Sequence, residues 1–197
     1  MPGTFIYLSY SGGPRVVPGD YKITLTSGQT TSTQTLTVKA DPRWEVDQAG
    51  FEAQLALQIE VRDMVTDIHS TIADIRSIRD QLEGIDLGDN KEAVANVKAF
   101  QEAITGVEDQ VIQTKTESHQ DPINYPVQLD THVGYLFSVA HSQEGRPNDA
   151  IYDRLEDLKK EWAAVKSDYD QLIGEDLKAI EDLLEELNIP YIHIPNR

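Results

Sequence analysis

Three pairs of an acid and a histidine offer the most direct chemistry in this sequence, because carboxylate and imidazole groups together can bind divalent metal ions or transfer protons. The pairs are Asp67 with His69, Glu117 with His119, and Asp130 with His132. Residues two apart on a helix point to different faces, so this spacing does not suit a metal site carried by one helix. We therefore expect structural or solvated roles for all three pairs.

The Glu-x-x-His pattern of di-iron and di-manganese helical bundles is also absent. The residues three positions before the five histidines are not acidic: Thr66, Thr116, Leu129, Ser138 and Pro190. No G-x-S-x-G, H-E-x-x-H or Gly-Lys-Ser/Thr phosphate loop occurs, and the chain lacks cysteine. We predict no catalytic residue, metal site or cofactor. One alternative stays open: a metal-binding or hydrolytic bundle whose site is built from scattered acids and histidines. With 34 acids in the chain, side chains that are distant in the sequence can meet at one site in the fold.

The charge of the chain excludes two classes of partner. Its 197 residues contain 17 Lys and Arg against 34 Asp and Glu, a formal net charge of −17. Binding to nucleic acid or to an anionic membrane surface requires a basic face, so we expect neither. No stretch approaches the 18 or more apolar residues of a membrane span.

Four segments have apolar residues at the three- and four-residue steps of amphipathic helices: residues 48–83, 90–118, 127–143 and 149–188. Asp47 is the N-cap candidate of the first, and Gly84 ends it. Asp89 and Glu92 form a capping-box-like pair before the second. Short connections favour antiparallel neighbours, so we predict an antiparallel up-and-down bundle of about four helices.

The last helix is the most informative about packing. Its apolar residues follow alternating steps of four and three from Ile151 to Leu172, which makes three heptads. From Val165 to Leu177 the steps are all of four residues, a stutter that locally unwinds a left-handed supercoil. Trp162 lies in this seam, so we expect it in the core. We expect the acidic run 175–186 to be the solvated face of the helix.

The N-terminal part of the chain reads as β structure. Alternation of apolar and polar residues predicts a hairpin near 20–40 with one buried face, preceded by a strand near 4–10. Residues 1–47 hold four bases and four acids, so the whole net charge lies in residues 48–197. Three strands are too few for a closed sandwich. Either the helices cover the apolar face, or further strands lie outside this sequence.

We therefore divide the chain into a β segment, residues 1–43, and a helical bundle with an extended tail, residues 44–197. The fold class is mainly α, of the α+β type. Trp44 at the junction is expected to pack between the two parts. Trp44, Tyr125 and Tyr191 are the candidates for contact with a partner or ligand. The apolar tail, residues 189–195, is expected to fold back onto the β segment or the bundle.

Three stretches together resemble a known family: GPRVVPGDYKITLT at residues 13–26, LTVKADPR at residues 36–43, and QDPINYP at residues 120–126. They are similar to the C-terminal region of large secreted bacterial β-propeller proteins with BNR or sortilin-like repeats, which are often labelled glycosyl hydrolases. In that family the propeller is followed by a small Ig-like β module and a helical tail.

The resemblance implies that residues 1–43 are the end of an Ig-like module, with Met1 as a boundary within a longer protein. Any catalytic propeller then lies upstream, because this chain has no S-x-D-x-G-x-x-W Asp-box. The expected function is that of a non-catalytic accessory module with a packing, dimerisation or partner-docking role. The expected partners are the upstream propeller, a second copy or another protein, in an extracellular or periplasmic location.

Overall fold

The computed structural model of the chain describes residues 12–118, 121–189 and 192–194. Their elements are β1 (Gly19–Ser27), β2 (Thr30–Val38), α1 (Gln48–Glu83), α2 (Lys91–Val111), the 3-10 turn η1 (Asp121–Ile123), α3 (Leu129–His141), α4 (Asp149–Gln171), the π-helix η2 (Leu172–Asp176) and α5 (Leu177–Glu186). The predicted mainly α architecture with a small antiparallel β segment is confirmed. The predicted strand near 4–10 lies outside the described residues.

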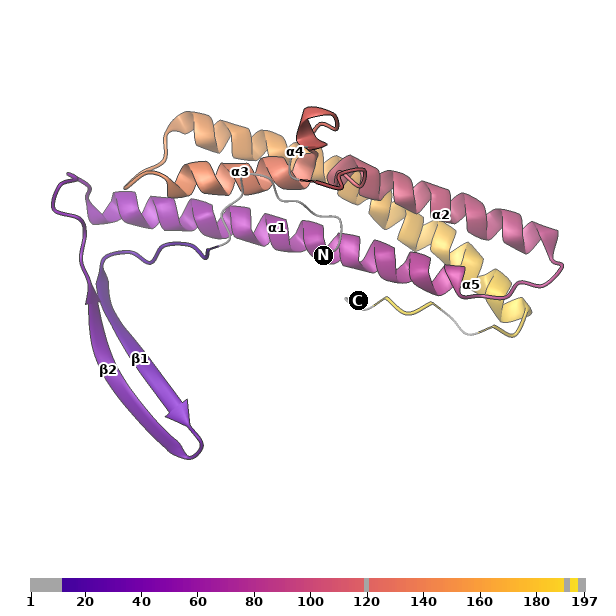
Figure 1. The fold of residues 1–197 in the computed structure, drawn as a ribbon, viewed down its shortest axis with the longest axis horizontal. Helices are drawn as coiled ribbons and strands as arrows, with labels where there is room; N and C mark the ends of the chain where they lie inside the picture. The colour runs from indigo at the N-terminus through magenta and orange to yellow at the C-terminus, as the bar shows by residue number, and fades with distance from the viewer. Residues whose placement is uncertain (1–11, 119–120, 190–191, 195–197) are drawn as a thin grey trace.

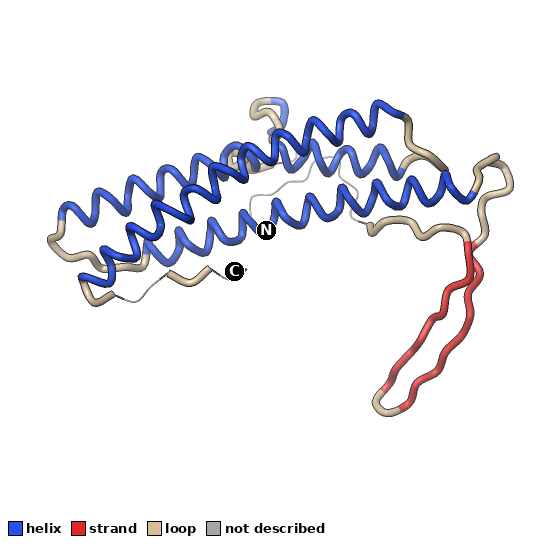
Figure 2. Tube along the Cα trace, turned by 180° about the vertical axis from the view of Figure 1, so that it is seen from behind, coloured by secondary structure: helices blue, strands red, loops and turns tan. Residues whose placement is uncertain are grey.

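The long helices form an elongated bundle from which the β-hairpin projects at one end (Figure 1). α2 and α3 follow one another along α1 and run opposite to it, while α4, η2 and α5 form one rod that returns along the bundle. Figure 2 shows the same arrangement from behind. α2 and α3 share one column that is antiparallel to both α1 and the α4–α5 rod, as expected for neighbours in an up-and-down bundle, whereas the α4–α5 rod runs in the same direction as α1 (Figure 1).

The ends of α1 agree with the sequence signals. Asp47 is the N-cap, and its Oδ1 accepts a hydrogen bond from the Gly50 backbone N–H at 2.8 Å. This bond satisfies one of the amide donors left free at a helix start. Gly84 is the C-cap. With 36 residues, α1 is about 54 Å long and spans the whole bundle.

The second and third helices differ from the predicted bounds. Asn90 rather than Asp89 is the N-cap of α2, accepting from the Ala93 N–H at 3.1 Å. α2 ends at Val111 instead of residue 118, since its C-cap Ile112 has an extended backbone and is 1% exposed. Burial of Ile112 therefore turns the chain out of the helix. α3 is two residues shorter at each end than the predicted 127–143.

The predicted stutter coincides with a π-helix. Tyr169, Ile173 and Leu177 are buried in succession. Leu177 therefore follows Tyr169 by eight positions, where a heptad repeat would give seven. One turn of π-helix accommodates one additional residue and returns the apolar stripe to the core. Trp162 is 7% exposed, which confirms it as a core residue.

The C-terminal tail folds back on the bundle, as predicted, in its described residues. Ile192 is 4% exposed within the hydrophobic core, and Ile189 and Ile194 pack against that core. Gln81 of α1 holds the tail through the backbone of His193.

Candidate interaction surface

The β-hairpin has two chemically different faces. In the observed register Tyr21 pairs with Leu36, and Gly19 pairs with Val38. Because side chains alternate along a strand, one face carries all the large apolar residues. We call it the apolar hairpin face: Tyr21, Ile23, Leu25, Leu36 and Val38. It contains no Asp, Glu, Lys, Arg or His.

The opposite face is polar and rich in threonine. It carries Thr24, Thr26, Thr31, Thr33, Thr35 and Thr37, together with Asp20 and Lys22. Thr24 and Thr33 lie within hydrogen-bonding distance across the strands at 3.1 Å, and Thr37 Oγ1 donates to Asp20 Oδ1 at 2.5 Å. This composition suits a face that stays in water, so the hairpin is strongly amphipathic.

The apolar hairpin face is not covered by the described helices, which corrects the expectation of a buried face. Leu25 is 70% exposed, Ile23 52% and Leu36 49%. The sheet has only the two strands β1 and β2 in the described part of the chain, so each strand has one edge without a neighbour. A two-stranded ribbon is marginal in water without packing of such a face. The apolar hairpin face is therefore the most prominent apolar surface without a packing partner among the described residues.

Arg15 anchors the root of the hairpin to the bundle. Its backbone N–H donates to Gln58 Oε1 at 2.9 Å, and its Nε donates to His141 Nε2 at 3.1 Å. The guanidinium also forms an ion pair with Glu144. These bonds join the segment before β1 to α1, to the end of α3 and to the connection that follows α3.

Two buried glutamines of α1 complete this anchor. Gln54 and Gln58 are 3% and 0% exposed, and both side-chain amides donate to the Ala140 carbonyl in the last turn of α3. They satisfy acceptors that the end of a helix leaves free. Gln58 thus links Arg15 and α3 at once, which fixes the hairpin root relative to the bundle.

A pocket of about 430 Å³ lies where the hairpin meets the bundle. Val16, Val17, Val38 and Phe51 supply apolar lining, and Val38 also belongs to the apolar hairpin face. The pocket therefore continues that face toward α1. Val16 is 53% exposed, so the combined surface can bury further apolar area against a partner.

The aromatic candidates lie in separate places. Trp44, in the connection between β2 and α1, is 57% exposed, so the expectation that it packs between the two parts is wrong. The bidentate pairing of Arg43 with Asp41 forms this turn and lowers the pKa of the Asp41 carboxyl. Tyr125 is 39% exposed in the connection between α2 and α3. Tyr191 lies outside the described residues.

Two of the three acid and histidine pairs lie within the described residues, whereas His119, the histidine of the third, lies outside them. Asp67 Oδ2 accepts a hydrogen bond from Trp162 Nε1 of α4 at 2.7 Å. Burial lowers the pKa of His69, whose Nε2 has no hydrogen-bond partner in the described part of the chain. Asp130 is 5% exposed and bonds to Thr131, and burial raises its pKa to about 6. Among the described residues, no group of three or more His, Asp and Glu side chains could hold a metal ion.

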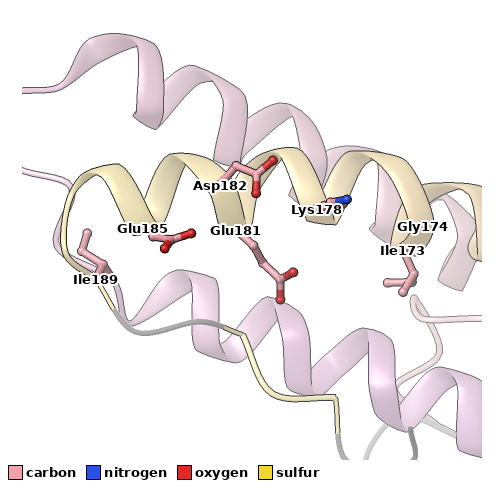
Figure 3. A pocket seen from close by; sticks show the side chains of 7 residues that line it. All are labelled: Ile173, Gly174, Lys178, Glu181, Asp182, Glu185 and Ile189. Atoms are coloured by element: carbon pink, nitrogen blue, oxygen red, sulfur yellow. The ribbon is translucent and has the colours of Figure 1, made fainter.

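A second, acidic pocket of about 720 Å³ lies between α5 and the tail (Figure 3). Ile173 and Ile189 form its apolar part, and Glu181 points from α5 toward α1 in this view. Asp182, Glu185 and Lys178 complete the polar rim. The carboxylates come from successive turns of one helix, which is the pattern of a solvated helix face.

The fold and these surfaces define a helical bundle that carries an exposed amphipathic hairpin. Comparison of the chain with protein-family models, curated proteins and solved structures found no match. No helix in the described residues has the length and apolar character needed to cross a membrane.

Sequence reasoning did not identify Arg15 as the residue that anchors the hairpin. Its partners Gln58 and Glu144 lie 43 and 129 residues away in the chain, so no local spacing signals the contact. The hairpin itself was predictable, because alternation is a local pattern.

Proposed function

We propose that this chain is a non-catalytic accessory module of a larger secreted β-propeller protein, placed C-terminal to the propeller in the extracellular space or the periplasm. The family and the location rest on the resemblance of residues 13–26, 36–43 and 120–126. The bundle holds the hairpin, and the hairpin is the attachment surface for the rest of the protein.

The observation that carries this proposal is the exposure of the apolar hairpin face. Three of the nine exposed large hydrophobic residues of the described chain, Ile23, Leu25 and Leu36, lie on this face, and a fourth, Val16, lines the adjoining pocket. Apolar residues gathered in this way mark a binding surface, whereas single exposed ones do not. The face also lacks ionised side chains, so burying it against an apolar partner leaves no charge unpaired.

The form of the hairpin favours a β-sheet as its partner. Two hairpins stacked face to face would cover both apolar faces but leave their strand edges unpaired. Two hairpins joined edge to edge would pair two edges but leave a doubled apolar face in water. A β-sandwich in a neighbouring module has two sheets, so one can hydrogen-bond to a free edge of the hairpin while the other covers the apolar hairpin face. We therefore favour attachment to the parent protein over dimerisation through the hairpin.

Hydrogen exchange of the hairpin amides tests this function. We expect the amides of β1 and β2 to exchange quickly in the isolated chain and to be protected in the complete natural polypeptide. Equal exchange in both, or a natural polypeptide without propeller repeats, would overturn the proposal.

A matched pair of variants shows which face attaches. Leu25→Lys places a charge on the apolar hairpin face, and Thr26→Lys places the same charge on the polar face of the same strand. Both residues are exposed here, so neither variant should change the melting temperature of the isolated chain. In the complete polypeptide only Leu25→Lys should restore fast exchange. The same effect from both variants would contradict a face-specific attachment.

A further inference from the structure

The hydroxyl group of Tyr21 fixes the entry into β1. Its O–H donates a hydrogen bond to the Val17 carbonyl, four residues earlier, at 2.7 Å. A tyrosine whose hydroxyl returns to the backbone a few residues upstream is the tyrosine corner of β-sandwich domains. The Tyr21 side chain is half-buried, and Val17 also lines the pocket at the hairpin root. β1 therefore begins in the same way as a strand of a two-sheet domain.

The strand that carries a tyrosine corner is an inner strand of its sheet. In immunoglobulin-type sandwiches it lies between two neighbours, and the strand that follows it in the chain lies at the edge. Here β2 follows β1 and is the only neighbour of β1 in the described part of the chain. By this pattern, a further strand belongs on the free edge of β1 rather than on the free edge of β2.

The distribution of side chains independently marks β1 as the inner strand. On the apolar hairpin face β1 carries Tyr21, Ile23 and Leu25, whereas β2 places Gln34 opposite Ile23 and Ser32 opposite Leu25. A third strand beside β1 puts the large apolar residues at the centre of the enlarged sheet. A third strand beside β2 would put Gln34 and Ser32 there, where polar side chains require hydrogen-bond partners.

The register shows which backbone groups face each edge. Gly28, at φ 59°, opens a two-residue turn, so Ser27 and Thr30 form the hydrogen-bonded pair that closes it. Such pairs alternate along an antiparallel ladder with pairs whose backbone groups point outward. The outward residues of β1 are Asp20, Lys22, Thr24 and Thr26. The outward residues of β2 are Thr31, Thr33, Thr35 and Thr37.

No feature of the hairpin closes the β1 edge. Natural sheets protect an edge with proline, a bulge, a short strand or a charge that points to the covered side. Both strands are nine residues long, lack proline and pair without a bulge. Asp20 and Lys22 lie on the polar face, which stays in water. In both views the hairpin projects clear of the helices (Figure 1 and Figure 2).

We propose that the free edge of β1 binds a β-strand of the neighbouring β-sandwich module, which leaves β2 as the outermost strand of the joined sheet. This inference rests on the proposed attachment function and specifies its geometry. The bound strand spans about seven residues, from the level of Asp20 to that of Thr26. Its side chains alternate between apolar residues, which extend the apolar hairpin face, and polar residues beside the threonine-rich face.

Residue-resolved hydrogen exchange in the complete natural polypeptide tests the proposal. We expect the outward amides of β1 to exchange at least roughly tenfold more slowly there than in the isolated chain. The outward amides of β2 should exchange at similar rates in both. Protection of the outward β2 amides to the same degree, or no protection of the outward β1 amides, overturns the proposal.

A matched pair of proline variants gives a second readout. Thr24→Pro removes an outward N–H from the β1 edge, and Thr33→Pro removes one from the β2 edge at the same level of the hairpin. Neither strand belongs to the helical core, so circular dichroism of the isolated chain should show unchanged helicity and melting for both variants. In the complete polypeptide only Thr24→Pro should restore fast exchange of the hairpin. The reverse result, or an equal effect of the two variants, contradicts binding at β1.

The amides that point between β1 and β2 separate this inference from the proposed function. Attachment of the hairpin stabilises both strands and protects these inward amides whichever edge is used. Their fast exchange in the complete polypeptide would contradict attachment itself. If they are protected while the outward amides of β1 are not, the attachment function holds and the β1 edge is not the strand-binding site.

Discussion

Glu108 of α2, whose side chain is 2% exposed, accepts a hydrogen bond from Arg76 Nε of α1 at 2.6 Å. Arg79 bonds to the other carboxylate oxygen at 2.8 Å. A buried carboxylate is thus paired with two guanidinium groups that reach partly into solvent. The ion pairs fix the register of α1 against α2.

We predict that removing the two arginines and removing Glu108 lower the free energy of unfolding by different amounts. Removing both cations in Arg76→Ala/Arg79→Ala leaves a buried charge without compensation and should cost about 3–5 kcal/mol. Glu108→Leu removes that charge and lets the arginines turn to solvent, so it should cost less than about 1 kcal/mol. Urea unfolding measures both. Equal losses would contradict the inference that burial of the carboxylate is the costly part.

The buried Asp130 predicts a specific pH dependence. Burial raises its folded pKa from 3.8 to about 6, so the folded state binds the proton more tightly than the unfolded state. The free energy of unfolding should therefore fall as pH rises from 3.8 to about 6 and then level off, a loss of about 3 kcal/mol at 1.36 kcal/mol per pKa unit.

Asp130→Asn isolates this contribution, because the amide oxygen can still accept the bonds from Thr131. We expect the variant to be more stable than the unaltered chain at pH 7 and to match it near pH 4. Urea unfolding across this range provides the measurement. A constant difference between the two proteins would show that Asp130 is not the titrating group.

The anchor at Arg15 should open in acid. His141 Nε2 accepts from Arg15 Nε, so it must be unprotonated, and burial followed by the charge of Arg15 lowers its pKa, with Glu144 opposing. The unfolded state then binds the proton more tightly, so the contribution of the anchor to stability is lost as pH falls below 6.5.

Limited proteolysis of residues 13–18 between pH 7.5 and pH 5 measures this opening. We expect cleavage to increase toward acid pH in the unaltered chain. The variant Arg15→Ala should be cleaved equally at both ends of the range, since the side-chain bond to His141 is already absent and only the backbone bond to Gln58 remains. A pH-independent rate in the unaltered chain would argue against the His141 contact as the sensitive element.

Deleting Gly174 should convert the π-helix η2 into ordinary α-helix. The deletion makes the apolar spacing a continuous heptad in which Leu172 takes the core position of Ile173. Gly174 is exposed, and a Cβ built there meets no atom within 4 Å, so its loss removes no packing. We expect retained helicity by circular dichroism and an equal or higher melting temperature. A strong destabilisation would mean that the wide turn itself is required.

The sequence by itself determined the elements, because each depends on spacing within a few residues. The steps of three and four located the four helical segments, Asp47 and Gly84 marked the ends of α1, and the π-helix, which the sequence did not predict, formed at the predicted stutter before Leu177. The hairpin and its turn at Gly28 followed from alternation. Local patterns favour these elements, although tertiary packing sets some of their ends, as the early end of α2 at Val111 shows.

Only the tertiary structure decided which surfaces are covered. Leu25 and Trp44 are apolar residues for which the sequence predicts packing contacts, yet they are 70% and 57% exposed. Conversely, Glu108 is charged but buried, because Arg76 and Arg79 meet it from α1. Such outcomes depend on residues far apart in the chain, whose meeting is set by how whole helices pack.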